Sequence, residues 1–102
     1  MNYKVIMSDD AQADYDEYID YILYDCNAPM TAAEHYAGIK DTIMDLSKNP
    51  YQYAVRTNIS LLQYGLNIRR VNFKKMAIIY TIHGNTIYVH RILAGSLITE
   101  LN

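Results

Sequence analysis

The chain has 102 residues, of which 51% are hydrophobic and 20% are charged, and its formal net charge is −2. This length suits one hydrophobic core, so we expect a single domain over residues 1–102, and the apolar content excludes an intrinsically disordered chain. The single cysteine, Cys26, excludes an internal disulfide, and no run of about 20 apolar residues or signal-peptide pattern occurs. We therefore expect a cytoplasmic protein with no membrane partner.

Charge is distributed unevenly along the chain. Residues 1–50 carry ten acidic and three basic residues, a net charge of −7, whereas residues 51–102 carry six basic residues and one acidic residue, a net charge of +5. Such asymmetry favours an acidic or polyanionic partner for the basic half.

The first half of the chain predicts a strand and two helices. Tyr3 to Met7 is rich in strand formers, and Ser8 is placed to cap the helix that follows. The apolar face of that helix, whose acids we expect to point outward, has a spacing of three and four residues and comprises Ala11, Tyr15, Tyr18, Ile19, Ile22, Leu23 and Cys26.

A second helix follows the break at Asn27-Ala28-Pro29 and ends before Asn49-Pro50. Two helices of similar length joined by a short break predict an antiparallel hairpin. The predicted buried face of the second helix comprises Tyr36, Ile39, Ile43 and Leu46. Residues 51–63 have no clear period and are interpreted as a surface excursion.

The second half predicts three antiparallel strands over Leu66–Phe73, Ala77–His83 and Thr86–Leu93, the last two joined by Gly84-Asn85. Such a two-residue turn pairs Ile82 with Ile87, Tyr80 with Val89, Ile78 with Arg91 and Ile79 with His90. One face, bearing Tyr80 and Val89, is then apolar and needs the helices to cover it. The other face, bearing Thr81, His83, Tyr88 and His90, is left open for binding.

These elements predict an α+β fold of two layers, with an N-terminal strand, an antiparallel helix hairpin and a three-stranded antiparallel meander that completes the sheet.

Six short segments, each unspecific alone, carry a family resemblance through their order and spacing. They are Tyr3-Lys4-Val5-Ile6 with Ser8 and Ala11, Tyr18-Ile19-Asp20-Tyr21-Ile22, Asn49-Pro50, Gly65-Leu66-Asn67-Ile68-Arg69-Arg70, Ile78-Ile79-Tyr80-Thr81-Ile82, and Ile87-Tyr88-Val89-His90-Arg91-Ile92-Leu93. In these the whole chain resembles the RelE/ParE superfamily of small bacterial toxins, which are the growth-inhibiting halves of type II toxin–antitoxin modules.

The resemblance implies a RelE/ParE-like fold, a cognate antitoxin whose C-terminal segment wraps the toxin, and a target inside the cell. It also associates the chain with plasmid stabilisation and addiction modules. RelE-like members cut mRNA on the ribosome, whereas ParE-like members poison DNA gyrase and are not nucleases. A shared fold does not choose between these activities.

The residues that the nuclease members use are mostly missing. Those members place basic residues and a C-terminal tyrosine on the open sheet face. The strand that usually reads Tyr-Arg, two apolar residues and Tyr here has Ala77 in place of the arginine. Gly95 stands where a second arginine is expected, Leu101 falls near the tyrosine position, and Arg70 alone keeps a basic position. Because each lost acid or base costs about 10²- to 10⁴-fold in rate, we expect no efficient nuclease.

A substitute site can still be assembled from the open face. His90 and Tyr88 are its candidate catalytic residues, because the pKa of histidine lies near neutrality. The candidate residues for holding phosphate or a target are Arg70, Arg69, Lys75 and Arg91. The structural alternatives are a hydrogen-bonding histidine and charges that protect an edge strand.

Two of these arginines have predicted orientations. Adjacent strand residues point to opposite faces, so we expect Arg70 on the open face and Arg69 as a rim residue or an ion-pair partner. We expect Arg91 on the core face, where its aliphatic stem would pack and its charge would find a carboxylate.

Tyr21 and Tyr24 fall off the buried face of the first helix. Exposed tyrosines are typical of protein interfaces, although scattered apolar surface is also normal, so both are candidate contacts for the antitoxin or for a homodimer. Because His35, His83, His90 and Cys26 lack the usual ligand spacing, we expect no metal and no cofactor.

Together these observations favour a toxin that is neutralised by a cognate antitoxin and acts on DNA gyrase without nuclease activity. The alternative is a ribosome-dependent mRNA endoribonuclease that uses Arg70, His90 and Tyr88. A third hypothesis is a degenerate module that only binds the antitoxin. Assembly as a homodimer or as a toxin–antitoxin hetero-oligomer is compatible with each of them.

Overall fold

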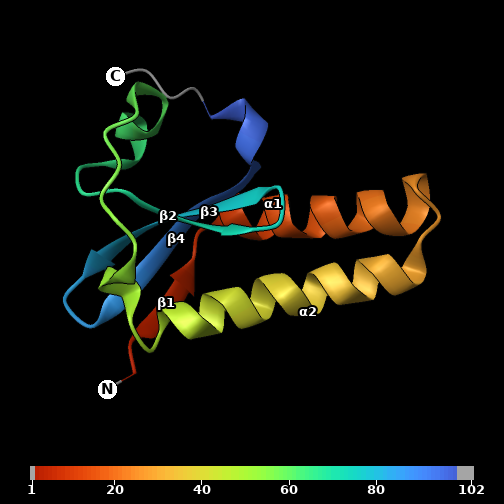
Figure 1. Cartoon of the computed structure of the whole chain (residues 1–102), viewed down its shortest axis with the longest axis horizontal. Coiled ribbons are helices and arrows are strands. Elements are labelled where there is room, and N and C mark those ends of the chain that lie inside the picture. Colours follow the sequence, from red (N-terminus) through yellow and green to blue (C-terminus); the bar gives the residue numbers. More distant parts are fainter. Residues whose placement is uncertain (1, 99–102) are drawn as a thin grey trace.

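A four-stranded sheet is covered on one face by two helices (Figure 1). The computed structural model describes residues 2–98. The elements in chain order are β1 (Lys4–Met7), α1 (Asp9–Asp20), the π-helical turn η1 (Tyr21–Asp25), α2 (Pro29–Leu46), the 3-10 helices η2 (Pro50–Gln52) and η3 (Ile59–Tyr64), β2 (Arg69–Phe73), β3 (Met76–His83), β4 (Thr86–Ala94) and the 3-10 helix η4 (Gly95–Leu97). The predicted α+β fold is confirmed. No helix within residues 2–98 is long and apolar enough to cross a bilayer.

Helix α1 begins at the predicted cap. The Oγ of Ser8 accepts the N–H of Ala11 at 2.9 Å, and this satisfies one of the unpaired donors of the first turn. Cys26, predicted on the core face, is exposed instead. The N–H of Cys26 bonds to the carbonyl of Tyr21, five residues back, so η1 adds a residue to the turn and rotates the helix end away from the core.

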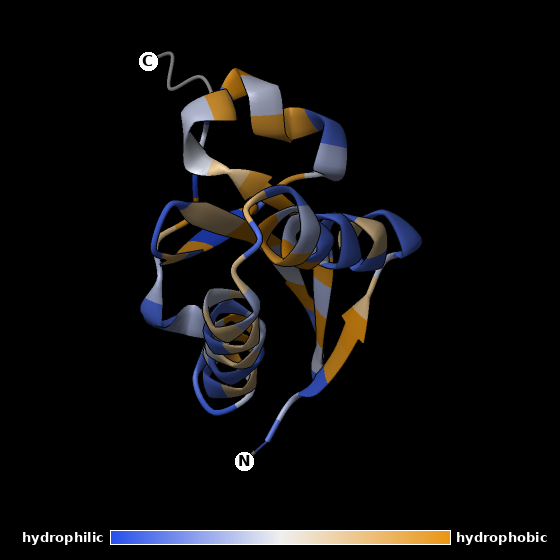
Figure 2. Cartoon of the chain, turned by 90° about the vertical axis from the view of Figure 1, so that its right-hand side faces the viewer, coloured by the Kyte–Doolittle hydropathy of each residue, from blue (hydrophilic) through white to orange (hydrophobic). Residues whose placement is uncertain are grey.

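Helix α2 returns beside α1 and buries a stripe that is shifted from the predicted one. Tyr36 was predicted to be buried but is 48% exposed, and its ring stacks on Tyr15 at the rim. The stripe passes instead through His35, whose Nδ1 lies 2.8 Å from the hydroxyl of Tyr18. Both helices are banded in polar and apolar residues, as amphipathic helices are (Figure 2). The buried members of the α2 stripe are Ala32, Ile39, Ile43 and Leu46.

The strand order is β1-β4-β3-β2, with β1 parallel to β4 and the other neighbours antiparallel. The β3–β4 turn places Gly84 at φ +59, a conformation that glycine adopts without strain. The predicted pairs next to this turn, Ile82 with Ile87 and Tyr80 with Val89, are confirmed. Strand β2 begins at Arg69 rather than at Leu66, because the intervening Asn67 has a positive φ of 61°.

A β-bulge changes the register beyond Tyr80. Ile79 faces Arg91 and Ile78 faces Ile92, so the predicted pairs of Ile78 with Arg91 and of Ile79 with His90 are wrong. The bulge gives β4 one extra residue, which reverses the faces of all the residues that follow it. Ile92 therefore enters the core and Arg91 leaves the core face.

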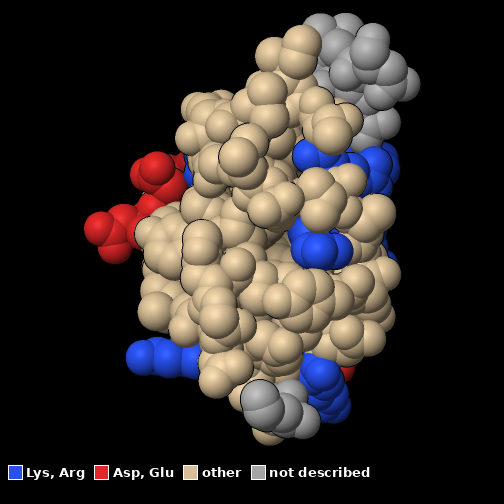
Figure 3. All heavy atoms as spheres, turned by 90° about the vertical axis from the view of Figure 1, so that its left-hand side faces the viewer, with Lys and Arg blue, Asp and Glu red and all other residues tan. Residues whose placement is uncertain are grey.

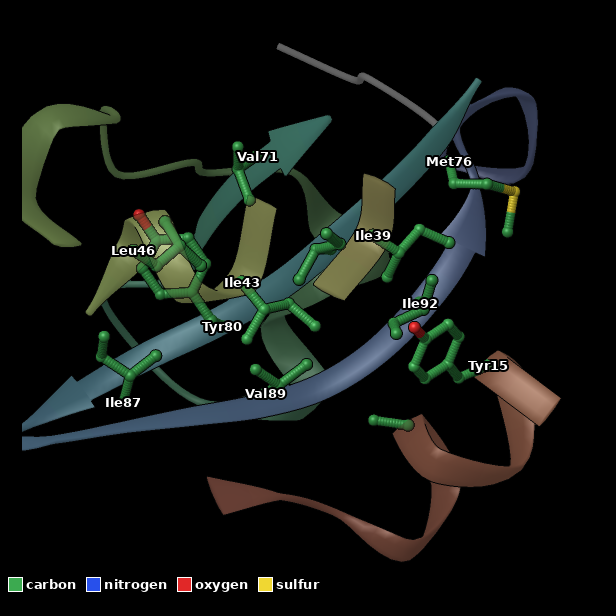
Figure 4. Close-up of a cluster of buried hydrophobic side chains, with 12 residues drawn as sticks. Tyr15, Ile39, Ile43, Leu46, Val71, Met76, Tyr80, Ile87, Val89 and Ile92 are labelled. Carbon is green, nitrogen blue, oxygen red and sulfur yellow. The ribbon is translucent and has the colours of Figure 1, made fainter. Parts of the chain in front are cut away.

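The core lies between the helix pair and the inner face of the sheet (Figure 4). Tyr80 is its largest fully buried side chain, and its hydroxyl donates a hydrogen bond of 2.7 Å to the carbonyl of Pro50. Burial raises the pKa of Tyr80 to about 12. Close packing also joins α2 to β2, since a β-carbon on Gly38 would clash with the ring of Phe73.

Candidate functional site

The sheet face turned away from the helices, called the outer face from here on, was predicted to be open, but one end of it is covered. The segment 51–63, interpreted as a surface excursion, overlaps the two 3-10 helices η2 and η3, which are too short to show a period in the sequence. Leu61 and Tyr64 of η3 and Ile98, which follows η4, bring apolar side chains over the sheet. The buried members of this second cluster are Leu61, Ile68, Ala77, Ile79 and Ile98, and the half-buried Tyr64 packs against them.

The other end of the outer face carries the histidine cluster, which we define as Thr81, His83, Tyr88 and His90. The buried Thr81 Oγ1 lies 2.8 Å from Nε2 of His83 and 2.8 Å from Nε2 of His90. A hydroxyl has one proton, so Thr81 can donate to only one of these two ring nitrogens and accepts from the other where that nitrogen carries a proton.

The ring of His90 is also held by aromatic neighbours. Tyr88 meets it edge-on at 4.7 Å, and Tyr64 of η3 lies 5.7 Å away, between centroids. Burial, and then the neighbouring His83, lower the pKa of His90 below 6.5. The lowered pKa favours the neutral form of His90, which does not by itself attract phosphate.

The β-bulge explains why this cluster was missed in the sequence. The predicted register treated His83 and His90 as residues that do not meet across the strands. His90 is the extra residue at the bulge, so it lies diagonal to Thr81, while His83 reaches the same oxygen from two residues along β3. Even so, residues 2–98 hold no group of three or more histidine, cysteine or acidic side chains placed to bind a metal.

Arg91 is held by helix α1. Its Nε and Nη2 donate to the two carboxylate oxygens of Asp14 at 2.7 and 2.9 Å, and Asp14 also accepts the N–H of Ile92. The hydrogen bond to Asp14 raises the pKa of Arg91. A carboxylate partner for Arg91 was predicted, but the acids of α1 were all expected to point outward. Asp14 instead points to the edge of β4 and neutralises the arginine.

The remaining candidate cations are spread around β2. Arg70 lies on the outer face, as predicted, and its Nε donates to Oδ1 of Asn72 at 2.9 Å. Arg69 points to the opposite face, donates to the carbonyl of Tyr53, and lies over the ring of Tyr51. Lys75 is exposed in the turn between β2 and β3.

Arg70 and the histidine cluster do not form one site. Arg70, Ile79 and Arg91 follow one another across three strands, so the backbone of Arg70 lies about 10 Å from that of Arg91. The guanidinium of Arg70 reaches toward Gly95, five residues after His90, and not toward the histidine cluster. The buried Ile79 and its cover stand between them. Ala77 is buried at the position where nuclease members carry arginine, and Leu101 lies outside the described residues. Within residues 2–98, therefore, Tyr88 and His90 come together and Arg70 stays apart.

Tyr21 and Tyr24 lie on η1, at the end of the helix pair that projects from the sheet (Figure 1). They are 55% and 71% exposed, as expected for residues off the buried face. Their role in binding another protein stays a prediction.

The chain has relatives of known fold. A family model described as "ParE toxin of type II toxin-antitoxin system, parDE" matches residues 5–97. The fold is similar to that of the chromosomal ParDE system from P. aeruginosa, with a TM-score of 0.69 and 19% identity over 90% of this chain and 95% of that chain. It is also similar to the toxin–antitoxin complex RelBE2 from Mycobacterium tuberculosis, with a TM-score of 0.62 and 17% identity over 92% of this chain and 99% of that chain. No curated protein matches the chain.

Proposed function

Because the chain belongs to the ParE toxin family of type II toxin–antitoxin systems, we propose that it arrests growth by binding a protein target, DNA gyrase, and not by cutting RNA. The observation that carries this proposal is the separation of Arg70 from His90 and Tyr88 by the buried Ile79. RNA cleavage needs a cation at the phosphate and an acid–base group within hydrogen-bond reach of the same atoms. Of the described candidate cations, Arg70 lies apart from His90 and Tyr88, and Arg91 is paired with Asp14.

The charge of the helix pair supports the same proposal. Residues 5–39 contain no lysine or arginine, while α1 and α2 carry acids along their exposed sides. Nucleic acid presents a dense row of phosphates and repels such a surface. A ribosome or a transcript would therefore have to approach from the sheet side, whereas a protein target can use either side.

The antitoxin is the second partner that we propose. The two solved relatives are toxin–antitoxin systems, and by analogy a cognate antitoxin would neutralise this chain through contacts that include Tyr21 and Tyr24. An intracellular target implies a cytoplasmic location. Plasmid stabilisation through addiction is the biological role that such a module would serve.

One observation favours the runner-up, a ribosome-dependent mRNA endoribonuclease. Tyr88 and His90 lie in contact, and the ring of Tyr64, which could stack on a base, lies 5.7 Å from that of His90. The lowered pKa of His90 would suit a general base at pH 7. This reading needs Arg70 or another cation to reach the same phosphate.

The proposal is tested by inducing the chain without its antitoxin and following DNA synthesis, protein synthesis and transcript integrity in the same cells. We expect an early block in DNA synthesis with intact transcripts. His90→Gln is the control variant, because it removes the acid–base group and lies in no proposed gyrase contact. It should arrest growth as the unmodified chain does.

Early loss of protein synthesis with cut transcripts, abolished by His90→Gln, would establish the nuclease instead. Undisturbed growth with a correctly folded chain would indicate the degenerate module.

A further inference from the structure

The two histidines of the outer face present the same ring nitrogen to the same point. Nε2 of His83 and Nε2 of His90 each lie 2.8 Å from the Oγ1 of Thr81, so the two nitrogens are no further apart than twice this distance. Thr81 is 3% exposed, whereas His83 is exposed and His90 is half-buried. Two imidazole nitrogens therefore converge at the surface, above a buried hydroxyl.

This convergence is close to the spacing of two nitrogens on one metal ion. With metal–nitrogen bonds of about 2.0 to 2.1 Å, two imidazoles on a tetrahedral ion have their nitrogens about 3.3 Å apart, and two on opposite sides of an ion about 4.1 Å apart. Because the ring of His83 is exposed, it can turn about its side-chain torsions to close the remaining gap. The backbone of neither strand has to move.

His90 is the fixed member of the pair. Its ring lies 4.7 Å from that of Tyr88 and 5.7 Å from that of Tyr64, between centroids. Its carbonyl accepts the hydroxyl of Ser8 at 2.7 Å, which ties this part of β4 to the start of α1. A ligand whose orientation is held by its surroundings binds a metal at a lower entropic cost. His83 is then the arm that closes on the ion.

The surroundings of the pair select the kind of ion. From Leu46 to Ile98 the chain has no aspartate or glutamate, and no third histidine, cysteine or acidic side chain of residues 2–98 completes a larger group. Much of the surface at the end where β3 turns into β4 is uncharged (Figure 3). Mg²⁺ and Ca²⁺ need oxygen ligands such as carboxylates, whereas neutral imidazoles suit Zn²⁺, Ni²⁺ and Cu²⁺.

We propose that His83 and His90 form a two-nitrogen surface site for a divalent ion of this second group, with Zn²⁺ as its simplest representative. The ion takes the place of Thr81 as the common partner of both Nε2 atoms, and each ring keeps its proton on Nδ1. Water or another molecule fills the remaining coordination positions.

The proposal reverses an expectation drawn from the sequence. We expected no metal because the predicted register kept His83 and His90 apart, and the β-bulge in β4 removes that reason. The inference goes beyond the proposed function and does not depend on the target of the toxin.

The test is calorimetric titration of Zn²⁺ into the purified full chain, prepared without a histidine tag, with Mg²⁺ as the comparison ion. We expect one bound Zn²⁺ per chain and no binding of Mg²⁺. His83→Gln and His90→Gln should each weaken Zn²⁺ binding about tenfold or more, because a single imidazole remains. The melting temperature of the unmodified chain should rise with Zn²⁺ concentration, since the unfolded chain does not hold the pair together.

The control variant addresses the other soft ligand of the chain. Cys26 is an exposed thiol that follows η1, at the far end of the helix pair. Cys26→Ser should leave the affinity for Zn²⁺ unchanged. Circular dichroism establishes that this variant and the two histidine variants are folded.

A second measurement needs no variant. In nitrogen-15 NMR spectra of the unmodified chain, Zn²⁺ should shift the Nε2 signals of His83 and His90 together. His35 is the internal reference, because its Nδ1 lies 2.8 Å from the hydroxyl of Tyr18 on the helix side of the sheet, and its signals should stay in place.

Three results would overturn the inference. They are the absence of Zn²⁺ shifts at both Nε2 atoms, undiminished affinity in the folded His83→Gln variant, and loss of binding in Cys26→Ser. The last result would assign the ion to the thiol at the end of the helix pair.

Discussion

At the scale of single residues, the contact that joins the two layers at the edge of β4 is the pair of Asp14 and Arg91. The side chain of Asp14 is 13% exposed, and its carboxylate accepts both Arg91 and the backbone N–H of Ile92. Removing the carboxylate leaves a half-buried guanidinium and a backbone donor without their acceptor, and that is more costly than losing a surface pair.

We predict that Asp14→Ala lowers the free energy of unfolding by about 2 to 4 kcal/mol. Urea denaturation followed by circular dichroism measures it. The matched control is Asp16→Ala, an exposed position on the same helix, which should change stability by no more than about 0.5 kcal/mol. Equal effects of the two substitutions would mean that the Asp14–Arg91 pair contributes little.

His90 gives a prediction about pH. Its pKa in the folded chain lies below the ordinary 6.5, so between these two values the unfolded chain binds the proton and the folded chain does not. The contribution of His90 to the free energy of unfolding is thus complete above pH 6.5. It is lost as the pH falls toward the pKa that His90 has in the folded chain. Between about pH 7.5 and pH 5, the unmodified chain should lose more stability than His90→Gln, as measured by urea denaturation. Parallel losses would place the pH dependence elsewhere.

At the scale of elements, η3 decides how much of the outer face is open. Leu61 is 1% exposed and packs on the sheet, while its neighbour Leu62 is 50% exposed. Leu61→Ala should lower the free energy of unfolding by about 2 to 4 kcal/mol, because it empties part of the second cluster. Leu62→Ala should stay within about 0.5 kcal/mol. Similar small values for both, measured by urea denaturation, would mean that η3 is not fixed to the sheet.

The end of the helix pair carries the prediction for the antitoxin. Tyr21→Ala with Tyr24→Ala should weaken antitoxin binding roughly tenfold or more and leave the melting temperature unchanged, because both rings are exposed. Isothermal titration with the cognate antitoxin measures it. Met44→Ala, an exposed change near the other end of α2, is the matched control. Unchanged affinity in the double variant would remove this contact.

Some of these elements could be predicted from the sequence and others could not. The cap at Ser8, both helices and the pairs beside the Gly84-Asn85 turn were predictable, because each depends on local spacing or turn chemistry. The exposure of Cys26 was not, since a π-helical turn leaves no mark in the apolar pattern.

Two errors in the candidate site had long-range causes. The bulge in β4 is set by packing and not by local propensity, and it brought His90 to Thr81 and moved Arg91 off the core face. The cover of the outer face by η3 could not be predicted, because Leu61, which packs in one cluster with Ile79, comes from a segment with no apolar period. Both changes made the outer face smaller and more divided than the sequence indicated.

At the scale of the whole molecule, charge is separated by layer. The helix pair is acidic, with no cation in residues 5–39, and the sheet with its 3-10 cover has no acid from Leu46 to Ile98. Such a molecule presents an acidic side and a basic side to its partners. A toxin that binds both an antitoxin and a target can use a different side for each of them.

The measurement that tests the account most directly adds the purified chain to DNA gyrase and, in parallel, to a translating extract with a defined transcript. The account predicts that supercoiling by gyrase is inhibited and that the transcript stays intact. Cleavage of the transcript, with gyrase unaffected, would contradict it and would assign the activity to the histidine cluster of the outer face.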